Sequence, residues 1–216
     1  MTDPLVTPLF FLLEIFLFLL YDTSMLKMVI FDMDGTLIHN RIPFEEMRNN
    51  IAKRLNVDPE SLKPLYEKLK EMNRPEVLEW LKEEEIRRAN VSYPDPGLTS
   101  VLEYIRNRKI VVAVLTRNCR EAARKALGWY LGMIDVLITR DDGYELKPSP
   151  EPIISLMNRF GFNPRDVLVV GDYDYDIQAG MLAGCKTVRI GTGFADYNII
   201  HLEELKPIIK KLAEGY

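Results

Sequence analysis

Residues 28–36 read MVIFDMDGT, a short apolar run that ends in an acidic, glycine-containing turn. Four more apolar runs of strand length follow, at Ile110 to Leu115, Val136 to Ile138, Val167 to Val170 and Thr187 to Ile190. Helical patterns lie between these four, at Arg120 to Leu131, Pro150 to Phe160 and Ile177 to Ala183. Strands that alternate with helices form parallel sheets, and unbroken runs such as IVVAVL are typical of strands buried on both faces. The sequence therefore predicts an α/β fold, a doubly wound parallel-sheet core of Rossmann-like type whose first strand is Val29 to Phe31.

The segment after the first strand breaks this alternation. From Asn40 to Tyr93 there is no strand-like run, only three charged helical patterns, at Phe44 to Leu55, Pro59 to Met72 and Pro75 to Asn90. We expect the charge run Lys82 to Glu85 to be a solvated face. The chain is accordingly divided into a sheet core of residues 28–39 and 94–216, a small helical domain of residues 40–93 inserted after the first strand, and an apolar extension of residues 1–27.

The extension contains the run LFFLLEIFLFLL at residues 9–20. As a helix these 12 positions would measure roughly 18 Å, short of the ~30 Å hydrocarbon core of a bilayer. No Lys or Arg precedes Lys27, so the basic start of a secretory signal is missing as well. We therefore expect no membrane partner and interpret translation as starting at Met25 or Met28. The alternative is a helix that docks on a membrane surface or a partner.

Composition narrows the function classes. The chain has 216 residues, with 28 Lys and Arg against 32 Asp and Glu and a net charge of -4. Nucleic-acid binding favours a basic excess, so no nucleic-acid partner is expected. The two cysteines, Cys119 and Cys185, are too few for a disulfide framework and lack the spacing of metal ligands. We interpret both as buried apolar side chains of a protein in a reducing, cytoplasmic compartment.

Polar residues gather just after three of the expected strands. Asp32-Met33-Asp34-Gly35-Thr36 follows the first, Thr116-Arg117-Asn118 the second and Gly171-Asp172-x-x-x-Asp176 the fourth, while Lys147 precedes a helix. Ligands of open parallel sheets bind beyond the carboxyl ends of the strands. Burying several like charges together costs free energy unless a cation and a function hold them there. The sequence therefore predicts one functional site that contains all four segments.

These four segments resemble, in their usual order, the four motifs of the haloacid dehalogenase superfamily of phosphotransferases, from Met28 to about Gly193. The helical insert, residues 40–93, lies where that superfamily has its C1 cap and is called the cap below. The Lys-Pro-Ser-Pro-Glu-Pro run at residues 147–152 is most similar to the group of phosphoglycolate phosphatase and β-phosphoglucomutase. The resemblance implies a Mg²⁺-dependent phosphatase that hydrolyses a small phosphorylated metabolite.

The acidic residues have distinct expected roles. Asp32 is the candidate nucleophile, because a carboxylate splits the displacement into two steps through an aspartyl-phosphate. Mg²⁺ prefers oxygen ligands and is expected on Asp32, the backbone carbonyl of Asp34 and Asp172. The Asp34 side chain is expected to protonate the leaving oxygen and then to deprotonate water. By the resemblance, dehalogenases lack an acid at this position, so Asp34 favours phosphoryl transfer. Asp176 is expected either to orient Lys or metal-bound water, or to cap a helix that starts at Ile177.

Donors and cations are needed around the phosphate. Thr116 is expected to donate its hydroxyl to a phosphate oxygen, and Lys147 to neutralise the nucleophile and the phosphoryl charge. Gly35 lets the backbone approach the phosphate closely. The remaining phosphate-binding candidates are Thr36, Arg117 and Asn118.

The substrate is the least determined part of this prediction. His39 and Tyr173 depart from the residues that the superfamily commonly has at these positions. We expect His39 to be a solvated surface residue, with substrate contact or a hinge role as the alternative, and Asp174 to be a solvent-facing turn residue. Candidate substrate-reading residues of the cap are Arg41, Arg48 and Arg74.

Three other functions stay open. A phosphomutase needs the same site and differs only in which acceptor enters after the first step. A phospho-receiver or binding module also combines acidic strand ends with Thr and Lys, but it needs no cap of about 50 residues. A membrane-associated phosphatase depends on the apolar extension. Neither the substrate nor the oligomeric state follows from the sequence.

Overall fold

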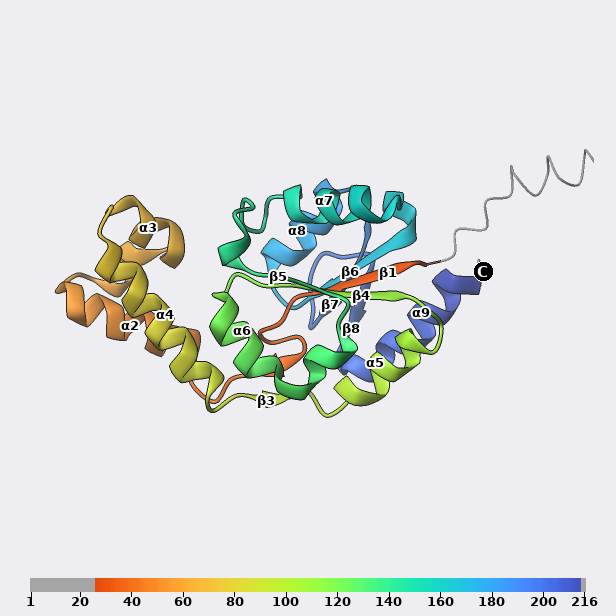
Figure 1. Ribbon diagram of the computed structural model, residues 1–216, viewed down its shortest axis with the longest axis horizontal. Coiled ribbons are helices and arrows are strands. Elements are labelled where there is room, and N and C mark those ends of the chain that lie inside the picture. Colours follow the sequence, from red (N-terminus) through yellow and green to blue (C-terminus); the bar gives the residue numbers. More distant parts are fainter. Residues whose placement is uncertain (1–25, 215–216) are drawn as a thin grey trace, which may run out of the picture.

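The computed structural model describes residues 26–214, and Figure 1 shows a sheet flanked by helices with a smaller helical domain beside one end of it. The strands of the large sheet are β1 (Met28–Phe31), β4 (Val111–Leu115), β5 (Val136–Ile138), β6 (Val167–Gly171), β7 (Lys186–Ile190) and β8 (Tyr197–Ile199). All neighbours pair in parallel, in the order β5-β4-β1-β6-β7-β8. The predicted parallel α/β core is confirmed, and β1 lies near the middle of it.

Helices cover both faces of this sheet. Helices α7 (Glu151–Phe160) and α8 (Asp174–Leu182) lie on one face, and α5 (Leu98–Arg106), α6 (Arg120–Leu127) and α9 (Leu205–Glu214) lie on the other (Figure 1). Because side chains alternate along β1, Val29 and Phe31 join the apolar core under α5 and α9, while Met28 and Ile30 join the core under α7. Burial on both faces explains why the strands are unbroken apolar runs.

The cap has an apolar core of its own. Its helices are α2 (Phe44–Leu55), the 3₁₀ helix η1 (Pro59–Leu62), α3 (Leu65–Glu71) and α4 (Pro75–Ala89). They bury a shared cluster that includes Met47, Ile51, Leu69, Val77 and Leu81. Two short antiparallel strands, β2 (Ile38–His39) and β3 (Tyr93–Pro94), join the cap to the sheet core. The cap is thus a separately packed unit on a two-stranded connection.

Several details of the sequence prediction are wrong. The Pro59 to Met72 pattern is two elements, because Pro64 lies between η1 and α3 and lacks the N–H that a continuous helix would use. The Arg120 to Leu131 pattern is α-helical only to Leu127, since Gly128 adopts a φ of 52° and the 3₁₀ helix η2 (Gly128–Met133) follows. Elements that the sequence analysis did not predict are β2, β3, β8, α5 and α9.

The charge run Lys82 to Glu85 is only in part the solvated face that the sequence predicted: the side chains of Lys82 and Glu83 are 38% and 54% exposed. Glu84 and Glu85 are both buried, at 5% and 3% exposure. Glu84 accepts hydrogen bonds from Asn50 and Arg87 within the cap, whereas Glu85 faces the sheet core. Charge patterning alone did not reveal this burial. The hydrogen-bond donors to these carboxylates lie either far away in the sequence, as Asn50 and Cys119 do, or one helical turn away, as Arg87 does.

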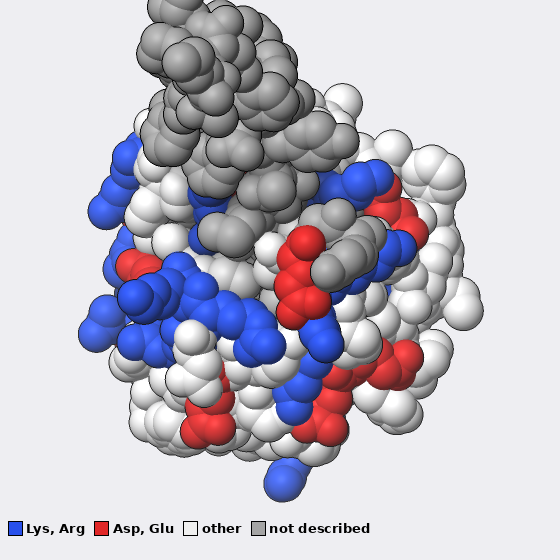
Figure 2. Space-filling view, turned by 90° about the vertical axis from the view of Figure 1, so that its right-hand side faces the viewer, with Lys and Arg blue, Asp and Glu red and all other residues white. Residues whose placement is uncertain are grey.

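The carboxyl ends of the strands face the cap. The opposite end of the core, where the strands begin, is drawn in Figure 2; Lys and Arg gather on one side of this visible face, and Asp and Glu lie among them. Within residues 26–214, no helix is long and apolar enough to cross a bilayer. The expectation for the apolar extension falls almost entirely outside the described residues.

Candidate active site

A cavity of about 910 Å³ lies between the cap and the carboxyl ends of the central strands. Of the residues that the sequence analysis proposed for catalysis, metal binding or phosphate binding, all but Thr36 line this cavity. The cap and its connecting strands contribute His39, Asn40, Phe44, Glu45, Arg48, Lys63, Pro64, Leu65, Arg88 and Tyr93. The parallel topology thus brings the four sequence segments together, as predicted from the tendency of open parallel sheets to bind ligands beyond the carboxyl ends of their strands.

Lys147 lies at the centre of the core side of the cavity. Its ammonium donates to Asp32 Oδ1, to the carbonyl oxygen of Leu115 at 2.8 Å, and forms an ion pair with Asp176 Oδ1 at 2.6 Å. Burial lowers the pKa of Lys147, but the charges of Asp176 and Asp32 outweigh burial and raise it well above its usual value. Lys147 is therefore a permanent cation beside the Asp32 carboxylate.

Asp32 follows directly after β1, an inner strand that pairs with β4 and β6, and its N–H donates to Val170 O at 2.8 Å. Burial raises the pKa of this carboxyl, and the attraction of Lys147 offsets the effect only in part; the charges of Asp176 and Asp172 raise it further. A buried carboxylate that lacks a full set of hydrogen bonds is poorly solvated and correspondingly reactive. Its environment suits a nucleophile.

Three carboxylates form a compact oxygen-donor cluster. Asp32, Asp172 and Asp176 each offer one ligand atom, and these atoms all lie within 4.8 Å of one another. Lys147 is the one cation paired with this cluster among the described residues, so two negative charges are left unbalanced. Burial, followed by repulsion from Asp176, raises the pKa of Asp172. An all-oxygen donor set with this charge excess fits a divalent cation such as Mg²⁺.

Gly35 and Thr36 support Asp172 from beneath. Gly35 has a φ of 83°, and a Cβ built on it would collide with the Asp172 carboxylate. The buried Thr36 hydroxyl donates to Asp172 Oδ1 at 3.2 Å. The structure therefore places Thr36 on a carboxylate of the cluster, outside the cavity lining where a phosphate oxygen would be.

Asp34 is held by side-chain amides from two parts of the chain. Asn40 Nδ2 donates to Oδ1, and Asn118 Nδ2 donates to Oδ2 at 2.6 Å. Burial raises the pKa of Asp34, while Arg88, whose Nη1 lies 3.9 Å from Oδ1, lowers it. A carboxyl with a raised pKa that lines the cavity has the properties of a general acid and base.

The loop after β4 contributes Thr116, Arg117 and Asn118 to the cavity lining, and the three side chains have different partners. The Thr116 hydroxyl accepts from the Asn118 N–H at 3.2 Å, which leaves its own hydrogen free for a ligand. Arg117, in contrast, also contacts the cap: its Nη2 donates to both carboxylate oxygens of Glu67, at 2.7 and 2.9 Å, while its Nη1 donates to Lys147 O. Of the two further donor candidates, Asn118 contacts Asp34 and Arg117 contacts the cap.

Asp176 does not occupy the helix N-cap position that the sequence analysis gave as one alternative. Helix α8 begins at Asp174, so Asp176 lies within its first turn and not before it. Its Oδ2 accepts from Tyr173 N at 3.1 Å while Oδ1 pairs with Lys147. The alternative of a helix N-cap before Ile177 is wrong, because the helix starts three residues earlier; Asp174 is exposed and pairs with Arg189.

His39 and the cap arginines complete the lining. His39 is half-buried, and its Nε2 lies 2.9 Å from Asp95 Oδ2 across the connection between β2 and β3, so the expectation of a solvated surface histidine is wrong. Arg48 lines the cavity, whereas Arg41 and Arg74 are exposed outside its lining. Arg88 lies deep in the cavity yet was missed, because a single Arg in a charged helix carries no local signal of burial.

Comparison with known proteins agrees with this geometry. Residues 29–190 match the family described as haloacid dehalogenase-like hydrolase. The phosphoglycolate phosphatase of Aquifex aeolicus is 29% identical over 188 residues, covering 80% of this chain and 88% of that protein. The pyrophosphatase PpaX of Oceanobacillus iheyensis is 26% identical over 211 residues, covering 88% of this chain and 99% of that protein.

Solved structures share the same fold. The crystal structure of CbbY from Rhodobacter sphaeroides in complex with phosphate aligns with a TM-score of 0.68 and 20% identity, over 84% of this chain and 96% of that one. The family match covers every strand end that contributes to the cavity. This chain therefore belongs to the haloacid dehalogenase-like hydrolase family.

Proposed function

We propose that this protein is a phosphatase that hydrolyses a small phosphomonoester through an aspartyl-phosphate on Asp32. The observation that carries the proposal is the position of Asp32, which pairs with the ammonium of Lys147 and has an oxygen within 4.8 Å of carboxylate oxygens of Asp172 and Asp176. A carboxylate buried among other carboxylates costs free energy, and a site for a cation and a phosphoryl group is what offsets that cost. The relatives named above are phosphatases that support the same activity.

The chain's own residues account for both halves of the reaction. In the first half, an Asp32 oxygen attacks phosphorus, the bond from phosphorus to the ester oxygen breaks, and Asp34 gives its proton to the leaving alcohol. In the second half, Asp34 takes a proton from water, the oxygen of that water attacks phosphorus, and Asp32 is restored as phosphate departs. Thr116 and Lys147 donate to the phosphoryl oxygens throughout.

A divalent metal ion fits the oxygen-donor cluster. Asp32 and Asp172 would hold Mg²⁺ with the Asp34 carbonyl, as the resemblance implies, and Asp176 would lie beside them through its contact with Lys147. When bound, the ion would offset the repulsion between the Asp32 carboxylate and an incoming phosphate. Without it, one ammonium faces three carboxylates and a dianionic ester would be repelled.

The cap side of the cavity favours an ester with a second anionic group. The Arg48 guanidinium makes one hydrogen bond, from Nη2 to the exposed Glu60 at 3.3 Å, and its buried Nε lacks a partner among the described residues. Lys63 lies beside it and shares Glu60. Phosphoglycolate and pyrophosphate, after which the relatives are named, both carry such a group.

A cytoplasmic location remains a prediction.

The test is phosphate release from a panel that contains phosphoglycolate, sugar phosphates, nucleotides, pyrophosphate and pyridoxal phosphate, with Mg²⁺ or with EDTA. Asp32→Asn is the blank, and Asp174→Asn is the matched control, because Asp174 is an exposed acid paired with Arg189. Metal-dependent release that is lost only in Asp32→Asn supports the proposal. A folded protein that releases no phosphate from any ester would overturn it, and an isomerised sugar phosphate would assign the site to a phosphomutase.

A further inference from the structure

Glu85 is a buried carboxylate of the cap that contacts the core. It lies on α4 and is 3% exposed. Its carboxylate accepts hydrogen bonds from both terminal nitrogens of Arg140, with Nη2 at 2.9 Å from Oε2. The Arg140 side chain is itself 8% exposed. Neither residue takes part in the mechanism described above. Since removing one member of a buried ion pair leaves the other charge uncompensated, such a pair fixes the two elements relative to each other.

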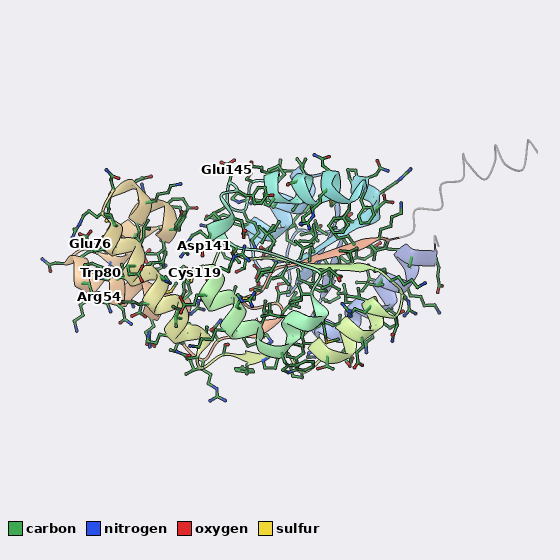
Figure 3. All side chains as sticks on the ribbon, viewed as in Figure 1. Arg54, Glu76, Trp80, Cys119, Asp141 and Glu145 are labelled. Atoms are coloured by element: carbon green, nitrogen blue, oxygen red, sulfur yellow. The ribbon has the colours of Figure 1, made fainter. Side chains whose placement is uncertain are left out.

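Both members of this pair also bind the loop after β4. Cys119 N donates to Glu85 Oε2 at 3.0 Å, and Arg140 Nη1 donates to Arg117 O at 3.1 Å. The Arg140 N–H donates to Asn118 O at 3.0 Å. Three consecutive residues of the loop are therefore hydrogen-bonded through their backbone to Glu85 or Arg140. Figure 3 shows Cys119 at the edge of the core that faces the cap.

The same loop supplies two groups of the proposed chemistry. Thr116 lines the cavity, and Asn118 donates to Asp34 at 2.6 Å. One turn further along α4, Arg88 donates to Ile42 O at 3.1 Å and approaches Asp34 to 3.9 Å. Helix α4 therefore contacts the site in two ways: Glu85 binds the backbone of the loop that carries Thr116 and Asn118, and Arg88 lies close to Asp34.

We propose that Glu85 and Arg140 are positioning residues, which couple the seating of cap helix α4 on the core to the geometry of the loop that carries Thr116 and Asn118. If α4 lifts away, Cys119 N and Arg140 lose Glu85 as their acceptor, and the loop keeps only its bonds to Arg140, whose guanidinium is no longer held by Glu85. Donors aimed at a developing charge lose most of their effect when they shift by about 1 Å. Thr116 and Asn118 thus take up their positions at the site only while the cap is seated. This inference rests on the proposed phosphatase activity.

The test compares two neighbouring buried acids of α4. Glu85→Gln keeps the shape but removes the charge that holds Arg140, and we expect kcat to fall about 10- to 100-fold while KM changes less than about threefold. Glu84→Gln is the matched control, because the described residues that donate to the Glu84 carboxylate, Asn50 and Arg87, both lie in the cap. We expect this control to lower the melting temperature and leave kcat unchanged.

Arg140→Lys gives a second approach should Glu85→Gln not fold, since Lys keeps the charge but cannot bind Glu85 and the Arg117 carbonyl as a planar fork. We expect the same fall in kcat. Thiol labelling gives a readout besides activity: Cys119 should label faster in Glu85→Gln than in wild type, with Cys185 unchanged.

The outcomes separate the two proposals. If wild type hydrolyses no ester, the phosphatase proposal fails. If wild type is active and both variants lower the melting temperature with unaltered kcat, the pair is merely structural and this inference is overturned.

Discussion

The two sides of the cavity are built differently. On the core side, the charged groups have fixed partners: Lys147 contacts Asp32, Asp176 and the Leu115 carbonyl, and both oxygens of Asp34 accept an amide. On the cap side, the Arg48 guanidinium has one long hydrogen bond to an exposed partner, and Phe44 and Tyr93 are exposed. Figure 3 shows other cap side chains, such as Arg54 and Trp80, pointing away from the core.

This difference separates two tasks. Groups that must meet a developing charge within a fraction of an ångström need pre-arranged partners, which the core provides. Groups that recognise the rest of a substrate need unsatisfied donors, which the cap provides. Changes on the core side should therefore reduce turnover for every substrate, and changes on the cap side should alter the choice among substrates.

The largest effect is expected from Asp32→Asn. The amide cannot form the aspartyl-phosphate, so kcat should fall by about 10⁴-fold or more for every ester in the panel. Steady-state phosphate release, with Asp174→Asn as the control, measures this loss. An Asn variant that retained a tenth of wild-type activity would show that the core side does not supply the nucleophile.

Metal removal should be nearly as damaging. With EDTA, three carboxylates face one ammonium, and phosphate release should fall by roughly 10³-fold or more, with recovery on adding Mg²⁺. Asp172→Asn should raise the Mg²⁺ concentration needed for half-maximal activity, because it removes one donor of the cluster. Activity that is equal with Mg²⁺ and with EDTA would contradict the assignment of the cluster to a metal.

The core side should also be closed to thiol reagents. Burial raises the pKa of Cys119 to about 11 and that of Cys185 to about 12, from 9.0. At pH 8 a thiol with a pKa of 11 is about 0.1% thiolate, roughly 100-fold less than an ordinary one. Labelling of the native protein at pH 8 should be at least that much slower than in urea, and should accelerate as pH rises toward 11. Fast native labelling of Cys185 would show a loosely packed core.

The core side of the cavity was more predictable from the sequence than the cap side. The core residues were found because each follows a strand, and parallel strands bring their carboxyl ends to one edge of the sheet. Gly35 and Lys147 were found by their place in a motif. In these cases local sequence and topology together fix the position.

The cap contacts were not predictable. Glu85 and Arg88 lie in a helix rich in charge, where neither composition nor period distinguishes a buried side chain from an exposed one. Their burial depends on Arg140 and Asp34, which are more than 50 residues away in the chain. The strands β2 and β3 were missed for a related reason, since two residues are too few for an alternating pattern.

Arg48→Met should change selectivity more than turnover. A charge-assisted hydrogen bond contributes about 1.5 to 3 kcal/mol, so KM for an ester with an anionic tail should rise about 10- to 100-fold. The measurement is the ratio of kcat/KM between phosphoglycolate and 2-hydroxyethyl phosphate, which has a neutral tail. Arg54→Met is the control, because Arg54 is on the same helix and pairs with Glu83 outside the cavity. An unaltered ratio in Arg48→Met would remove Arg48 from substrate recognition.

The smallest effect is expected at the pair of Glu67 and Arg117, a second ion pair between the cap and the core. These side chains are 39% and 25% exposed, in contrast to 3% and 8% for Glu85 and Arg140. A partly solvated pair contributes at most about 1 kcal/mol and is screened by salt. Glu67→Gln should therefore change kcat/KM by less than about fivefold, and 0.5 M NaCl should remove most of the difference from wild type. A large change that persists in salt would mean that this contact, and not the buried pair of Glu85 and Arg140, controls how the cap sits over the core.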